Sequence, residues 1–148
     1  MISKPLQILL ADDDKDDSLF FKMALDGLSV PTNLASVING EELMSHLLEN
    51  SDALPDVLFL DLNMPRKNGF ECLSEIKLNQ KLKSLPVIIF STSYEQEVVN
   101  QLYFNGAQYF IRKPPEFSQL KKIIQHTFEL ITQGQISQPN REGFVLTA

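Results

Sequence analysis

Acidic side chains concentrate at one point of this sequence, directly after a short apolar run. The segment ILLADDDKDD (8–17) passes from four core-type residues into five Asp within six positions. A further acid, Asp61, ends the apolar run DVLFLD (56–61). Two unit charges about 4 Å apart repel by about 4 kcal/mol at an effective dielectric constant of about 20, so carboxylates that converge need a cation or a shared proton.

The acids of the first cluster divide into two groups. Asp14, Asp16 and Asp17 fall where a helix should begin, and there acidic side chains cap free N–H groups and complement the helix dipole. We therefore assign these three a structural role. Asp12 and Asp13 could be either loop residues or metal ligands. The presence of Asp61 favours the interpretation as ligands, because a carboxylate at the end of a wholly apolar strand costs free energy to bury and has no evident structural role there. Oxygen ligands without nearby His or Cys favour Mg²⁺, and Mn²⁺ could take the same site.

The elements that must position these acids alternate along the chain. Apolar runs predict strands at 6–11, 33–38, 56–61, 86–91 and 108–113. Apolar residues spaced by three and four predict helices at 15–27, 41–49, 70–80, 94–105 and 117–131. In the first helix we expect the buried side to consist of Leu19, Phe20, Met23 and Ala24. Strict alternation of strand and helix predicts an α/β fold, a parallel sheet with right-handed crossovers and helices on both faces.

This arrangement gives the acids a common position. In open α/β sheets, ligands bind beyond the carboxyl ends of the strands, near the point where the strand order reverses. Asp12 and Asp13 end the first strand and Asp61 ends the third. If these two strands are neighbours, the three carboxylates converge.

Composition and charge set broad limits. The chain of 148 residues is most simply one domain, with a net charge of −6 and a pI near 4.8 that argue against nucleic-acid or anionic-membrane binding. No apolar run approaches the roughly 20 residues that span a bilayer, and no secretory signal is recognisable. Cys72 is the single cysteine, so no intramolecular disulfide can form. We expect a cytoplasmic protein with its domain at 1–131, a flexible tail at 132–148 and no output domain.

Four segments in order carry a resemblance to a known family. LLADDD, LFLDLNMPRKNG, VIIFSTS and YFIRKPP together resemble the receiver domain of response regulators in two-component signalling. The resemblance covers residues 6 to about 131. It implies a flavodoxin-like, doubly wound sheet of five parallel strands in the order 2-1-3-4-5.

The resemblance also implies roles for individual acids. Asp61 would be the phosphoacceptor and would form an aspartyl phosphate. Asp13 would bind Mg²⁺ directly, while Asp12 would act nearby, through water. The backbone carbonyl of Asn63 would complete the protein's ligands to the metal.

Three further positions match the family's pattern. Ser91 would donate a hydrogen bond to a phosphoryl oxygen, and the family spacing favours it over Thr92. Lys113 would pair with Asp61 or with its phosphoryl group, and the family places a cis peptide bond between Lys113 and Pro114. Phe110 would be the aromatic residue that follows Ser91 when the protein switches.

The function implied is that of a single-domain response regulator of the chemotaxis or phosphorelay type. It would take a phosphoryl group from a histidine kinase or a histidine phosphotransfer protein in a Mg²⁺-dependent reaction. It would then signal to a separate downstream protein through the surface formed by 94–105, 108–113 and 117–131. Such a protein is not a conventional enzyme, although it assists its own phosphorylation and dephosphorylation.

Three alternatives remain from other classes. A pseudo-receiver would keep the fold and act only as a scaffold or adaptor. A phosphatase similar to haloacid dehalogenases also uses an Asp nucleophile with Mg²⁺, but it needs a second Asp where this chain has Asn63. A flavodoxin-like cofactor binder would need a phosphate-binding loop rich in Ser, Thr or Gly after the first strand, where this chain has Asp residues.

Overall fold

The computed structural model describes residues 4–134 and 137–147, in which strands and helices alternate. Their bounds are β1 (Leu6–Ala11), α1 (Lys15–Asp26), β2 (Thr32–Val37), α2 (Gly40–Glu49), β3 (Val57–Leu60), α3 (Gly69–Leu78), β4 (Val87–Ser91), α4 (Gln96–Phe104), β5 (Tyr109–Arg112), α5 (Phe117–Thr132), a 3₁₀ helix η1 (Arg141–Gly143) and β6 (Val145–Leu146). The ten predicted elements are confirmed to within about two residues at each end. None of the helices described is long and apolar enough to cross a membrane.

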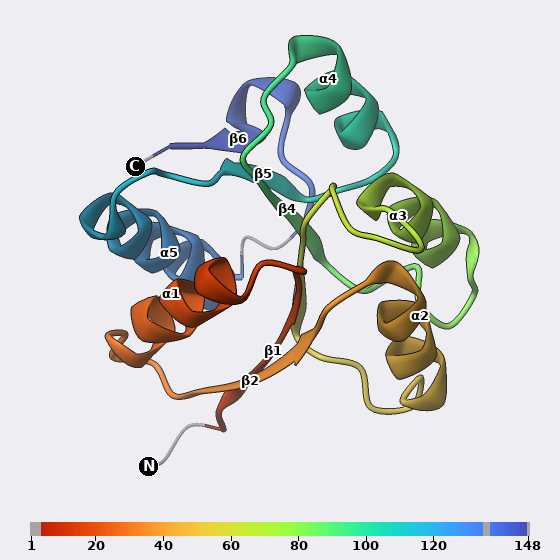
Figure 1. Cartoon of the computed structure of the whole chain (residues 1–148), viewed down its shortest axis with the longest axis horizontal. Helices are drawn as coiled ribbons and strands as arrows, with labels where there is room; N and C mark the ends of the chain where they lie inside the picture. Colours follow the sequence, from red (N-terminus) through yellow and green to blue (C-terminus); the bar gives the residue numbers. More distant parts are fainter. Residues whose placement is uncertain (1–3, 135–136, 148) are drawn as a thin grey trace.

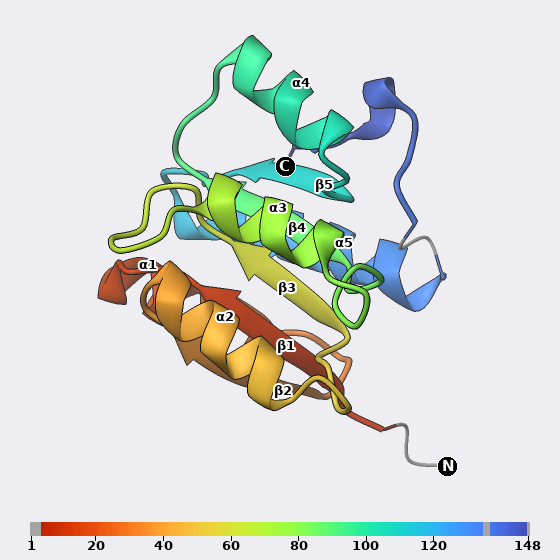
Figure 2. The same cartoon turned by 90° about the vertical axis from the view of Figure 1, so that its right-hand side faces the viewer.

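The strands form one parallel sheet in the order β2-β1-β3-β4-β5-β6. Helices α1 and α5 cover one face, and α2, α3 and α4 cover the other (Figures 1 and 2). Strand side chains alternate between the two layers: Leu58 and Leu60 of β3 pack on the α2–α3–α4 side, whereas Val57 and Phe59 pack on the α1–α5 side. The central strands are apolar throughout because both of their faces are covered.

The register of β1 and β3 brings their carboxyl ends together. Ala11 lies opposite Leu60, and the backbone N–H of Asp61 donates to the Ala11 carbonyl over 2.9 Å. On the other side of β1, the N–H of Asp12 donates to the Val37 carbonyl. The predicted adjacency of the first and third strands is thus confirmed.

Among the described residues the sheet has six strands, one more than predicted, and the sixth lies within the segment 132–148 that we expect to be a flexible tail. Residues 137–147 return to the sheet, and β6 pairs with β5 at Phe110 and Ile111. The side chain of Phe144 is fully buried. In this segment the sequence has one short apolar run, 144–146, which is too short to show the periodicity of a strand or a helix. Polar contacts hold the rest of the segment against the domain.

Those contacts join the C-terminal segment (137–147) mainly to α4. The Gln138 side chain donates to the Tyr103 carbonyl over 2.6 Å, and the Tyr103 hydroxyl donates to the Pro139 carbonyl over 2.9 Å. Arg141 Nε donates to Asn100 Oδ1 over 2.7 Å. The segment therefore covers the edge of β5 and lies against α4.

The predicted buried side of the first helix was also wrong in part. Of its four residues only Ala24 is buried, and it packs with Phe21 and Leu25, while the other three are about half exposed. An α-helix turns by about 100° per residue, so displacing the buried side by one residue selects a different set of side chains. The three remaining apolar residues of α1 are therefore only partly covered, and Phe20 lies beside the ring of Phe117 at a centroid distance of 6.1 Å.

Candidate functional site

The carboxylates of Asp12, Asp13 and Asp61 meet at the carboxyl edge of the sheet. One oxygen from each lies within 4.8 Å of the others, in a group that could hold a metal ion. Asp12 and Asp61 are 2% and 6% exposed, whereas Asp13 is open to solvent. Three oxygen ligands on a partly open edge suit Mg²⁺ or Mn²⁺, which keep some of their water.

Burial makes this cluster electrostatically unfavourable. It raises the pKa of Asp61 to about 6; the nearby charge of Asp12 adds to this effect, and the ammonium of Lys113 opposes it. Burial also raises the pKa of Asp12 above its usual range. A bound cation would relieve both effects.

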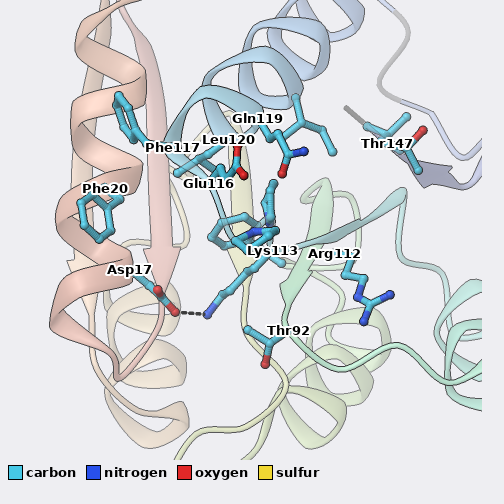
Figure 3. Close-up of a pocket in the computed structure, with 15 residues that line it drawn as sticks. Asp17, Phe20, Thr92, Arg112, Lys113, Glu116, Phe117, Gln119, Leu120 and Thr147 are labelled. Carbon is cyan, nitrogen blue, oxygen red and sulfur yellow. Dashed lines mark hydrogen bonds and ion pairs between the residues drawn. The ribbon is translucent and has the colours of Figure 1, made fainter.

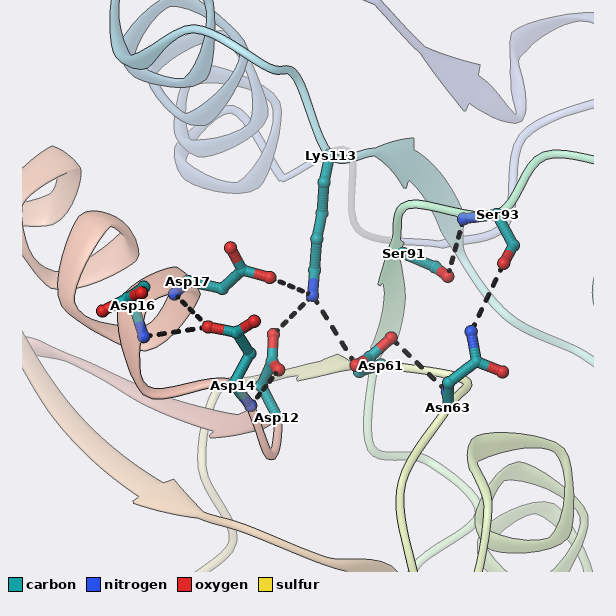
Figure 4. Close-up of polar contacts among 9 residues, drawn as sticks. All are labelled: Asp12, Asp14, Asp16, Asp17, Asp61, Asn63, Ser91, Ser93 and Lys113. Carbon is teal, nitrogen blue, oxygen red and sulfur yellow. Dashed lines mark hydrogen bonds and ion pairs between the residues drawn. The ribbon is translucent and has the colours of Figure 1, made fainter.

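Lys113 supplies the positive charge that the protein itself places in the cluster (Figure 4). Its Nζ lies 2.7 Å from Asp12, 2.9 Å from Asp17 and 3.6 Å from Asp61. The backbone N–H of Lys113 donates to the Ser91 carbonyl, which fixes the starting point of this side chain at the end of β5. Burial alone would lower the pKa of Lys113, but the hydrogen bonds to Asp12 and Asp17 outweigh it and raise that pKa, so the side chain stays charged.

The contact of Asp17 with Lys113 was missed from the sequence. Asp14 is the N-cap of α1 as predicted, because its side chain accepts from the N–H groups of Asp16 and Asp17. Asp17 also lies in the first turn, but its carboxylate additionally reaches Lys113 from the α1 side. Their pairing depends on how α1 and the end of β5 are placed in space, and no local pattern shows that.

Hydrogen bonds link the loops that follow β3 and β4. The N–H of Asn63 lies 3.5 Å from Asp61 Oδ1, and the Asn63 side-chain amide donates to Ser93 Oγ over 3.3 Å. The N–H of Ser93 in turn donates to Ser91 Oγ. Ser91 is fully buried at the end of β4, whereas Thr92, the second choice, is exposed. Ser93 is a member of the site that sequence reasoning passed over.

Phe110 lies in the core below the loop that follows β4. Its ring is fully buried and meets the edge of the Tyr94 ring at a centroid distance of 5.8 Å. Its backbone N–H donates to the Phe144 carbonyl over 3.0 Å. Phe110 therefore touches both the β4–α4 loop and the C-terminal segment.

A cavity of about 870 Å³ lies beside the cluster, between α1, α5 and the end of β6 (Figure 3). Its lining is largely apolar and includes Phe20, Phe117 and Leu120. Asp17 and Lys113 form its border with the cluster.

The peptide bond between Lys113 and Pro114 is trans, because the described residues contain no cis peptide bond. The resemblance implied a cis bond at this position.

The loop after β3 packs without room for an added side chain. A Cβ on Gly69 would clash with the backbone oxygen of Asp61 and lie 2.8 Å from Leu62 Cα. Asn68 and Glu71 form a capping box at the start of α3. The helix therefore begins directly against the backbone of Asp61.

Comparisons with known proteins agree with this geometry. The family described as the response regulator receiver domain matches residues 8–125. Response regulator Rcp1 of Synechocystis sp. is 33% identical over 126 residues, which are 82% of this chain and 85% of Rcp1. The crystal structure of the phosphorylated cyanobacterial phytochrome response regulator RcpA aligns with a TM-score of 0.81 at 33% identity, covering 88% of this chain and 96% of RcpA.

The Mn²⁺-bound form of Rcp1 aligns with a TM-score of 0.78 at 30% identity, covering 91% of this chain and 99% of that one. The chain therefore belongs to the receiver domain family of response regulators, a family of two-component signalling proteins rather than conventional enzymes. The predicted flavodoxin-like fold is confirmed, with β6 added after the order 2-1-3-4-5.

Proposed function

We propose that this chain is a response regulator that accepts a phosphoryl group on Asp61. The observation that carries the proposal is the grouping of Asp61 with Asp12, Asp13 and the ammonium of Lys113 at one edge of the sheet. In the reaction, an Asp61 oxygen attacks phosphorus, an Asp61–phosphorus bond forms, and the bond from phosphorus to the donor breaks. Such a transfer depends mainly on positioning and on neutralising charge.

The acidic residues would hold a divalent cation. Asp12, Asp13 and Asp61 offer carboxylate oxygens, and Asn63 would add its backbone carbonyl. A bound Mg²⁺ or Mn²⁺ would supply positive charge opposite the phosphoryl oxygens. The donor set fits either ion, and the related Rcp1 has been crystallised with Mn²⁺.

Two residues of this chain would act on the phosphoryl group directly. Lys113 would place its ammonium against a phosphoryl oxygen, since its Nζ is already 3.6 Å from Asp61. Ser91, buried at the end of β4, would turn its hydroxyl toward another oxygen and give up its bond from the Ser93 N–H. Phe110 would then rotate within its contact with Tyr94. The movements of Ser91 and Phe110 would together shift the protein from its unphosphorylated conformation toward a second, active conformation.

We further propose a histidine kinase or a histidine phosphotransfer protein as the natural donor, in the cytoplasm. The downstream protein would bind on the side of α4, β5 and α5. In this chain β6 covers the edge of β5. A partner on that side would therefore meet α4 and the C-terminal segment in place of an open β5.

The structure favours this function over the phosphatase alternative. That chemistry needs a carboxylic acid at position 63, and the amide of Asn63 donates to Ser93 instead of carrying a transferable acidic proton. The pseudo-receiver alternative shares every structural feature named above. It is separated from the proposed function by whether Asp61 is phosphorylated.

The experiment is incubation with acetyl phosphate and Mg²⁺, followed by intact mass measurement. The wild type should gain one phosphoryl group, Asp61→Asn should gain none, and omission of Mg²⁺ should abolish the gain. Asp52→Asn, which removes an exposed acid from the loop before β3, at the opposite end of that strand from Asp61, should behave as the wild type does. Equal labelling of Asp61→Asn would contradict the assignment of the acceptor, and no labelling of the wild type would favour the scaffold alternative.

A further inference from the structure

The ammonium of Lys113 has two close carboxylate partners, and neither of them is Asp61, the proposed phosphoacceptor. Asp12 and Asp17 lie 2.7 Å and 2.9 Å away, against 3.6 Å for Asp61. Asp12 directly follows β1, Asp17 lies in α1 and Asp61 directly follows β3, so the three acids approach Nζ from different sides (Figure 4). In this state the charge that phosphorylation would need is already engaged elsewhere.

Asp12 and Asp17 differ in what a cation would do to them. Asp12 belongs to the group of acids that could hold a metal ion, so a bound metal would share its charge. Asp17 is outside that group and would keep its full charge for Lys113. Its side chain is 33% exposed, while that of Lys113 is 8% exposed. With a metal bound, Asp17 would therefore be the carboxylate that competes most strongly with a phosphoryl group for the ammonium of Lys113.

We propose that Asp17 is a positioning residue that holds Lys113 toward α1 and limits its contact with the phosphoryl group on Asp61. This inference rests on the proposed function. An ammonium shared between two anions stabilises each of them less than it would stabilise one alone. Asp17 would therefore set how strongly the site binds a phosphoryl group, although it does not touch that group.

Asp16 provides a matched control. It carries the same charge in the same first turn of α1 and is exposed. Its backbone N–H bonds to Asp14, and the described contacts of Lys113 do not include its side chain. Asp16→Asn therefore removes one negative charge near the site without freeing Lys113.

The test is the affinity for beryllium trifluoride, a non-hydrolysable phosphoryl mimic, measured by isothermal titration calorimetry at saturating Mg²⁺. Asp17→Asn should lower the Kd by about three- to tenfold, because it removes one competitor for the ammonium. Asp16→Asn should change the Kd by less than about twofold. Asp17→Glu, which restores a carboxylate, should return the Kd close to that of the wild type.

Two results would overturn the inference. If Asp17→Asn and Asp16→Asn lower the Kd equally, Asp17 acts only through general charge. If Asp17→Asn raises the Kd, the contact with Lys113 assists phosphoryl binding instead of competing with it. Failure of the proposed function looks different: Asp61→Asn would then bind beryllium trifluoride as the wild type does, or the wild type would not bind it.

Discussion

The buried carboxylate of Asp12 lies 2.7 Å from the ammonium of Lys113, although the two residues are 101 positions apart in the sequence. Asp12 follows β1 and Lys113 follows β5, and strands β3 and β4 lie between these two in the sheet. The lysine side chain therefore crosses the carboxyl ends of two strands to reach its partner. This single contact joins the start of the chain to its last third and neutralises a charge that the core would not otherwise accept.

Replacing Lys113 by Met should therefore destabilise the protein. The change leaves Asp12 and Asp61 buried without their common counter-charge, and loss of one partner from a buried ion pair costs about 3 kcal/mol. Urea unfolding at pH 7 without divalent cations measures the change in the free energy of unfolding. Saturating Mg²⁺ should restore part of the loss. Lys122→Met, at an exposed position of α5, is the control, and an equal effect of the two changes would refute the role given to this contact.

The stability of the protein should depend on pH through Asp61. Burial raises its folded-state pKa from 3.8 to about 6, so the folded state binds this proton more tightly than the unfolded state does. The resulting stability is present below about pH 4 and is lost as the pH rises toward 6. Asp61→Asn avoids the burial of a charge and should be more stable than the wild type by up to about 3 kcal/mol at pH 7.5 without metal.

That advantage of Asp61→Asn should shrink as the pH falls from 7 to 4. Urea unfolding curves collected across this range for both proteins give the difference directly. Asp52→Asn, at an exposed position, should show no such trend. A difference between Asp61→Asn and the wild type that stays constant across the range would mean that the charge of Asp61 is not its cause.

Gly69→Ala should disturb the position of Asp61. The added methyl group would clash with the backbone oxygen of Asp61, so either α3 or the acceptor loop must move. We expect a loss of about 2 kcal/mol in the free energy of unfolding and slower labelling by acetyl phosphate. Gly27→Ala is the matched control, since its new Cβ would meet neighbours at ordinary distances of 3.6 Å or more. Equal behaviour of the two variants would exclude close packing as the reason for glycine at position 69.

Phe144→Ala should test whether the C-terminal segment belongs to the folded domain. The ring is fully buried between the sheet and Tyr103, at a centroid distance of 5.2 Å from the tyrosine ring. Its removal should cost about 3 kcal/mol in thermal or urea unfolding. Phe104→Ala removes the same side chain from a position that is 81% exposed and should cost little. If Phe144→Ala has a negligible effect on the free energy of unfolding, the C-terminal segment (137–147) does not contribute to the stability of the domain and is a flexible tail, as the sequence predicts.

The sequence predicted the parts of this molecule that depend on local pattern. Apolar runs marked the first five strands, and the acids at the ends of two of them marked the cluster of Asp12, Asp13 and Asp61. Those signals are strong because a strand covered on both faces excludes polar residues until it emerges from the core. The position of Asp14, Asp16 and Asp17 likewise predicted that they begin a helix, and in the structure Asp14 is its N-cap.

The remaining features depend on contacts that are distant in sequence. The pairing of Asp17 with Lys113 needs the placement of α1 beside the end of β5, and the two residues are 96 positions apart in the sequence. Strand β6 has two residues, and its place is fixed by Phe144 and by polar bonds to α4, which no periodicity encodes. The buried side of α1 was misjudged because its apolar residues outnumber those that the sheet can cover.

Strand β6 also changes the exposure of β5 to other chains. An edge strand offers unpaired N–H and C=O groups that can template the addition of a foreign strand, and native proteins shield such edges. Within the described residues the last strand of the sheet is β6, whose two residues are too few to guide such pairing. The strand that carries Phe110 is thereby protected from intermolecular β-addition, so variants that detach residues 137–147 should aggregate more readily than the intact protein.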